Sequence, residues 1–205
     1  MTYKFKELKI LILKKIPHLE KNCYLECISS NGEHIKIFLK NGLISKKLFI
    51  LEPGSTFLID TFNKNEKIYL NKFDLIKYRP ELKNYQSHKT FAQTLNLISN
   101  IFQNKEFSPK IYTFASNLIH NQHIDHRNYL LYVVLNFLFI EGFIDYQSNQ
   151  NPKINKIIFY GTQTNLDNFK KIKIPIELEK ELRLFLTRII EDNFNLPSIQ
   201  NLLLV

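Results

Sequence analysis

Long apolar runs are absent from this sequence. The longest, YLLYVVLNFLFI at 129–140, contains Asn136 and is shorter than the roughly 18 apolar residues of a membrane-spanning helix. Near the N-terminus, lysines end the apolar run ILIL, so neither the length nor the small-residue cleavage site of a signal peptide is present. We therefore expect a globular cytoplasmic protein without a membrane partner.

Cysteine and catalytic motifs are also scarce. Cys23 and Cys27 lie in one strand-like segment, where their side chains share a face but are too far apart for easy bridging, so we interpret them as reduced core thiols. No GK[ST], GxSxG or HExxH motif occurs, and no pair of acidic residues is placed to hold two metal ions. The sequence therefore predicts a protein that is not an enzyme and has no cofactor.

Arginine is rare, with 4 arginines against 24 lysines, and the net charge is +9. Residues 1–90 hold 17 Lys/Arg and 9 Asp/Glu, a net charge of +8, whereas residues 91–205 have a net charge of +1. AT-rich codon usage could explain much of the net charge, so its distribution along the chain is the stronger evidence. The distribution indicates that an anionic partner binds the N-terminal half.

Five β-branched or aromatic-rich segments in that half are separated by turn signals, which predicts strands at 8–16, 22–29, 33–40, 55–62 and 66–73. Asn31-Gly32 indicates a hairpin between the second and third segments. Only the connection LKNGLISKKLFILEPG, at 39–54, is long. This plan is that of an OB-fold barrel, a fold that commonly binds single-stranded nucleic acid, and an SH3-like barrel is the alternative.

The second half has helical periodicity. We expect a helix capped by Ser87, a second beginning at Ser108-Pro109, and a nearly all-apolar central helix capped by Asp125 and ended by Gly142. Pro175 begins a further helix, and residues 197–205 could add a short last one.

Residues 147–174 lose this periodicity and are predicted to be irregular, with a short strand or hairpin near 156–160. The predicted fold is therefore α+β: a five-stranded OB-fold β-barrel over residues 1–80, packed on a C-terminal α-helical domain over 81–205.

Lysines alternate with aromatic residues in the strands. The third strand places Lys36, Phe38 and Lys40 on one face, and Lys67 and Tyr69 repeat the pattern in the fifth. An aromatic ring between cations can stack a base while the cations contact phosphates. The alternative is that Phe38 packs under the helical domain.

The long connection carries Lys46 and Lys47, which we expect to lie at the barrel mouth beside Lys14 and Lys15. There they would add a salt-dependent attraction to phosphates that does not depend on sequence. The alternative is a solvated loop. His120, His123 and His126 suggest a metal cluster, but we interpret them as a polar loop between helices and predict no metal site.

Five segments follow one another along the chain: NGEHIKIFLKNG, LEPGSTFLIDTF, KIYLNKFDLIKYRPELK, FAQTLNLIS and, later, LNFLFIEGFIDY. In the order of these segments, the chain resembles the RecO family of bacterial recombination mediator and DNA repair proteins. Members often carry a four-cysteine zinc module after the central helix, whereas residues 147–174 contain neither Cys nor His, so this chain resembles the zinc-free type. Lysines also stand where the family tends to use arginines in the connection, which retains phosphate contact without planar stacking.

The resemblance implies a nucleoid-associated protein that binds single- and double-stranded DNA and anneals complementary strands. With the partner RecR, it would help load RecA onto single strands coated by SSB. It also implies that the acidic SSB C-terminal tail docks near the central helix, where Arg127, beside Lys110, could hold its carboxylate.

Two other classes remain open: a small RNA-binding or ribosome-associated OB-fold protein, and an interaction adaptor whose lysines reflect codon usage.

Overall fold

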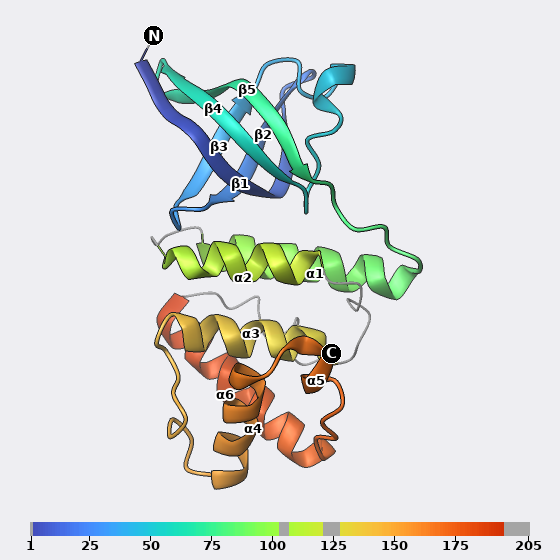
Figure 1. Ribbon diagram of the computed structural model, residues 1–205, viewed down its shortest axis with the longest axis vertical. Coiled ribbons are helices and arrows are strands. Elements are labelled where there is room, and N and C mark those ends of the chain that lie inside the picture. The colour runs from blue at the N-terminus through green and yellow to red at the C-terminus, as the bar shows by residue number, and fades with distance from the viewer. Residues whose placement is uncertain (1, 103–106, 121–127, 195–205) are drawn as a thin grey trace. The chain divides into compact units, whose positions relative to one another are not determined.

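A computed structural model describes residues 2–102, 107–120 and 128–194. The chain divides into two compact units, the first comprising residues 1–82 and 98–121 and the second residues 83–97 and 122–205 (Figure 1). The first unit contains the strands and the second is helical. The expected α+β class, with an N-terminal five-stranded sheet followed by helices, is confirmed.

The sheet is formed by five strands in the order β1-β2-β3-β5-β4, and β1 also pairs with β4, so that the sheet closes into a barrel. Their bounds are β1 Thr2–His18, β2 Asn22–Ser29, β3 His34–Leu39, β4 Thr56–Lys64 and β5 Lys67–Lys77. The pairing of β3 with β5 is parallel and every other pairing is antiparallel. Strand β1 is longer than predicted and contains bulges, which let one strand bend to pair with both β2 and β4.

Alternate residues of each strand point into the barrel, and most of these residues are apolar, so the interior forms a hydrophobic core. Ile35, Ile37 and Leu39 of β3 belong to this core, as do Cys23 and Cys27 of β2. Both cysteines are free and buried, as the sequence predicted. Burial raises the pKa of each thiol, so both remain protonated and unreactive at neutral pH.

The hairpin between β2 and β3 forms where Asn31-Gly32 predicted it, but its loop has three residues. The Ser29 N–H donates to Glu33 O (2.9 Å), and the Gly32 N–H donates to Ser29 O (3.0 Å). Gly32 has a φ of +85°, the left-handed conformation that such loops require. This loop length fixes which residues of β2 and β3 lie opposite each other.

Two helices have residues in the first unit: α2 (Pro109–Ile119) and the C-terminal end of α1 (Tyr85–Phe102). Ser108 caps α2 and accepts a hydrogen bond from the Lys110 N–H, which confirms the Ser-Pro prediction. Helix α2 packs against β2. Ile28 of β2 and its partner Leu11 are fully buried even though they alternate with core positions, so the barrel exterior is also covered in part.

The predicted cap of α1 is wrong. Ser87 is buried within the helix, and Asn84 caps it, because the Asn84 Oδ1 accepts hydrogen bonds from the Ser87 N–H (2.8 Å) and hydroxyl (2.9 Å). Asn and Ser are both good caps, so the pattern alone did not choose between them. The proposed cap of the next helix, Asp125, lies outside the described residues, as does the expected last helix.

The second unit is built around α3 (Tyr129–Ile140), which is buried along most of its length, as its all-round apolar sequence predicted. Helices α4 (Pro152–Gln163), α5 (Leu166–Phe169) and α6 (Ile176–Phe194) contact it. Gly142, with a φ of +76°, ends α3: its N–H donates to Phe139 O, and the following N–H donates to Leu138 O. Pro175 stands immediately before α6, as expected.

The prediction that residues 147–174 are irregular, with a strand or hairpin near 156–160, is wrong, because this segment forms α4 and α5. Asn151 caps α4 and Pro152 occupies its first position, while Ile154, Ile157, Ile158 and Gly161 form its buried stripe. The β-branched and aromatic run at 157–160 favoured a strand locally, but burial of the stripe against α3 favours the helix. Within the described ranges, no helix is both long enough and apolar enough to cross a membrane.

Candidate nucleic-acid interface

A row of aromatic side chains crosses the barrel strands on the face opposite the core. Tyr24 of β2 pairs with Phe38 of β3, Phe38 with Tyr69 of β5, and Tyr69 with Phe62 of β4. Consecutive ring centroids lie 5.2, 5.3 and 5.4 Å apart, and Phe62 and Tyr69 are stacked with an interplanar angle of 11°. We call these four residues the aromatic row.

Phe38 lies at the centre of the row and is 8% exposed. It packs against Tyr24 and Tyr69, and His18 of β1 lies at the edge of the same cluster, with its ring 5.0 Å from Tyr24 and 6.0 Å from Phe38. The other three rings of the row are partly exposed. Phe38 therefore anchors the row, and its neighbours provide the accessible π surface.

Lys67 supplies a positive charge at this surface. Its Nζ lies 4.7 Å from the centroid of the Phe38 ring and 6.0 Å from that of Tyr24. A cation above an aromatic face is held by the ring quadrupole. The structure thus brings together Phe38, Lys67 and Tyr69, three residues that the sequence had singled out on two separate strands.

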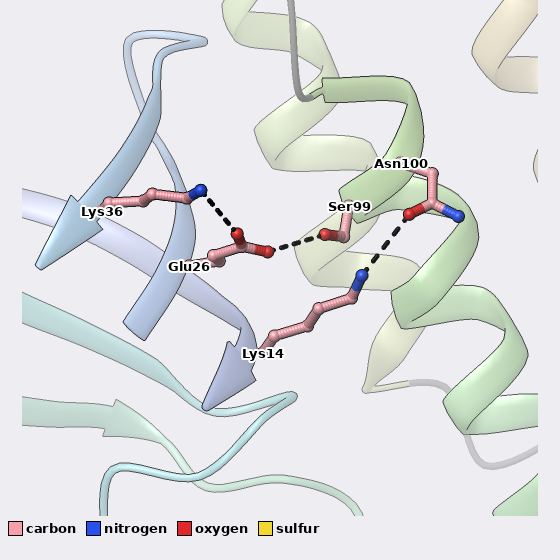
Figure 2. A network of polar contacts seen from close by, with 5 residues as sticks. All are labelled: Lys14, Glu26, Lys36, Ser99 and Asn100. Carbon is pink, nitrogen blue, oxygen red and sulfur yellow. Dashed lines mark hydrogen bonds and ion pairs between the residues drawn. The ribbon is translucent and has the colours of Figure 1, made fainter. Parts of the chain in front are cut away.

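Lys36 and Lys14 belong to a polar network that joins barrel strands to the C-terminal end of α1 (Figure 2). The Lys36 Nζ lies 3.1 Å from the Glu26 carboxylate, which also accepts a hydrogen bond from the Ser99 hydroxyl at 3.1 Å. The Lys14 Nζ donates to Asn100 Oδ1 (3.4 Å). Glu26 is 2% exposed, and its negative charge offsets one of the two lysines, so this region is less positive than the lysine positions suggest.

The connector between β3 and β4 contains the short helix η1 (Lys46–Leu48). Lys46 and Lys47 are exposed, and the Lys47 Nζ lies 5.6 Å from the Phe73 ring centroid of β5. The Lys15 Nζ donates to Leu48 O (3.2 Å) and lies 6.0 Å from the Phe49 ring centroid. Lys40, at the end of β3, is exposed. The connector therefore presents exposed cations on a backbone that Lys15 fixes to β1.

Two partly buried histidines of the first unit, His34 and His120, have lowered pKa values. Burial, together with the charge of Lys77, lowers the pKa of His120 to about 4. Burial also lowers the pKa of His34; the charges of Lys36 and Lys14 act in the same direction, while Glu26 opposes them. Both side chains are therefore neutral at physiological pH and add no charge to the interface.

The His120 shift predicts acid sensitivity. Because the folded protein holds His120 neutral while the unfolded chain protonates near pH 6.5, its stabilising contribution is full above about pH 6.5 and is lost as the pH falls toward 4. Urea unfolding followed by circular dichroism at pH 7.5, 6 and 4.5 should show a smaller loss of stability on acidification for His120→Gln than for the wild type. An unchanged pH dependence would show that His120 does not control this transition.

The remaining predicted residues include three that the structure does not describe. Lys110 is exposed in the first turn of α2. Arg127, His123 and His126 lie outside the described residues. Among the residues that the structure describes, no group of His, Cys, Asp or Glu side chains is arranged to hold a metal ion.

Sequence reasoning missed Tyr24, Phe62 and His18 as parts of this surface. Two signals were available. Alternation points Tyr24 away from the core, because Cys23 and Leu25 on either side of it are core residues. Hairpin register is the other: a two-residue Asn-Gly loop would place Leu39 opposite Tyr24, whereas the three-residue loop places Phe38 there. No protein-family model and no curated protein sequence matches this chain.

Proposed function

We propose that this protein is a DNA-binding recombination mediator of the RecO type, and that its barrel is an OB fold that binds single-stranded DNA. The observation that carries the proposal is the aromatic row with Lys67 on the outside of the barrel. Aromatic faces stack unpaired bases without regard to sequence, and neighbouring cations contact the phosphates. A duplex offers no such access, because its bases are stacked on one another.

The OB-fold assignment is supported by the closed strand order β1-β2-β3-β5-β4, by the length of β1, which pairs with two strands, and by the long connection between β3 and β4. The positive N-terminal half supports binding of a polyanion. The exposed cations Lys40, Lys46 and Lys47 would extend phosphate contact beyond the row. Lys14, Lys15 and Lys36 would contribute less because each makes a hydrogen bond or an ion pair within the protein.

Strand annealing would follow from the same charge. Two complementary strands repel each other until cations neutralise their phosphates, so a basic surface that also holds bases unstacked lowers the barrier to pairing. In this proposal the protein would also contact duplex DNA through phosphates and cooperate with RecR, the SSB tail and, indirectly, RecA. Arg127 and Lys110 would be the contacts to the SSB tail.

Replacing Tyr69 with alanine tests the base-stacking role. We expect the affinity for a fluorescent single strand to fall about fivefold or more, because one stacked base contributes roughly 1–3 kcal/mol. Tyr160→Ala is the matched control, since Tyr160 is a half-exposed tyrosine of α4, in the second unit. Fluorescence anisotropy with DNA and RNA of the same sequence would measure both variants.

Equal DNA affinities for Tyr69→Ala and Tyr160→Ala would contradict the stacking site. Tighter binding to RNA than to DNA would instead favour the RNA-binding class.

A further inference from the structure

A buried carboxylate stands next to the aromatic row in the strand register. Glu26 of β2 is 2% exposed and pairs across the sheet with Lys14 of β1 and Lys36 of β3. In the same β2–β3 ladder, Tyr24 pairs with Phe38. Side chains two residues apart along a strand share a face and lie roughly 7 Å apart. Glu26 is therefore the neighbour of Tyr24, and Lys36 that of Phe38, on the outer face of the barrel.

Two side chains hold this carboxylate. The Ser99 hydroxyl of α1 donates to one Glu26 oxygen at 3.1 Å, and the Lys36 Nζ lies 3.1 Å from the other (Figure 2). Ser99 is fully buried, whereas the Lys36 side chain is 57% exposed. Removing the cation from a buried ion pair leaves an uncompensated charge, which is unfavourable. The buried Glu26 therefore retains Lys36 even though Lys36 itself faces solvent.

Lys36 and Lys40 can be compared directly, because they stand two residues before and two residues after Phe38, the centre of the row. Lys40 is exposed, whereas Lys36 is paired with Glu26. A phosphate that approached Lys36 would compete with a carboxylate only 3.1 Å from its Nζ, which water cannot solvate in place of the cation. Lys36 is therefore the less available of the two cations that flank Phe38.

We propose that Glu26 regulates the single-strand site by keeping Lys36 from the DNA phosphates, so that a bound strand is released more readily. The inference rests on the proposed function and adds an inhibitory residue to its site. Each phosphate contact increases the affinity through the counterions that it displaces, and most changes in affinity appear in the dissociation rate. A protein that anneals strands has to release each of them, and a site with one fewer phosphate contact does so faster.

The test replaces the carboxylate with a neutral amide of the same shape. Glu26→Gln keeps an acceptor for the Ser99 hydroxyl but no longer holds Lys36 by charge. It should bind a fluorescent single strand about fivefold more tightly than wild type at 0.1 M salt, with a salt slope steeper by about 0.7. The strand should also leave about fivefold more slowly when unlabelled competitor is added. Glu81→Gln, which neutralises an exposed acid of the first unit, is the matched control and should show neither effect.

An abasic strand of equal length separates this inference from the proposed function, because it keeps the phosphates and lacks the bases. The gain in Glu26→Gln should appear on both strands, and adding Lys36→Gln should abolish it. If the folded Glu26→Gln protein binds no more tightly than wild type, or if the double variant keeps the gain, the inference is overturned and the single-strand site stands. If wild type binds both strands equally, the stacking site fails, and the gain in Glu26→Gln alone decides the inference.

A second comparison does not require Glu26→Gln to fold. Lys36→Gln, whose amide can still donate to Glu26, should lower the salt slope of single-strand binding much less than Lys40→Gln, which removes a full contact of about 0.7. Filter binding at several salt concentrations would measure both slopes. Equal decreases would show that Lys36 already contacts a phosphate in the wild type, and the inference would be overturned.

Discussion

The Gly32→Ala variant is expected to be about 3 kcal/mol or more less stable than the wild type. A Cβ at this position would lie 1.9 Å from Phe107 O, and Phe107 donates its N–H to Gly32 O, so the β2–β3 loop cannot move away without losing that bond. The φ of +85° adds strain for any residue with a side chain. Chemical denaturation followed by circular dichroism would measure the change.

Gly142→Ala is the matched control. Gly142 also has a positive φ, +76°, but a Cβ there would meet no atom within 4 Å. Its cost should be that of the backbone conformation alone, about 1–2 kcal/mol. A similar loss of stability in both variants would show that the clash of the new Cβ with Phe107 O adds nothing to the cost of the Gly32→Ala substitution.

Reversing the connector charges, with Lys46→Glu and Lys47→Glu together, is expected to weaken single-strand binding about 25-fold or more at 0.1 M salt. Each phosphate contact to a single strand contributes roughly 0.7 to the slope of log affinity against log salt concentration. Between 1 M and 0.1 M salt, one contact therefore raises the affinity about fivefold, and two contacts raise it about 25-fold. The salt slope should fall by about 1.4 for the two contacts. Both side chains are exposed, so the fold should tolerate the change.

Lys153→Glu with Lys156→Glu is the corresponding control, because these two lysines are exposed on α4, in the second unit, and the pair changes the net charge by the same amount. Filter binding at several salt concentrations would distinguish a local contact from the total charge. If both double variants weaken binding equally, the protein's overall charge, and not the connector, attracts the DNA.

Local patterns in the sequence determined much of the architecture. Alternating apolar residues and turn signals predicted all five strands, because the strands' inward faces are mostly apolar. The limits of β2 agree with the prediction. The caps at Ser108-Pro109, Gly142 and Pro175 were also correct. Helix α4 was missed because residues 157–160 favour a strand in isolation, and only packing against α3 resolves the conflict.

The candidate site depended more on tertiary structure. The sequence by itself determined that the cations lie in the N-terminal half and that Phe38 and Tyr69 point away from the core, since both properties follow from composition and alternation. It did not determine which rings meet, because one residue of loop length between β2 and β3 changes the partner of Tyr24. Nor did it show that Glu26 offsets the charge of Lys36 while Lys46 and Lys47 remain exposed, because such pairings depend on distances between strands and helices that are far apart in sequence.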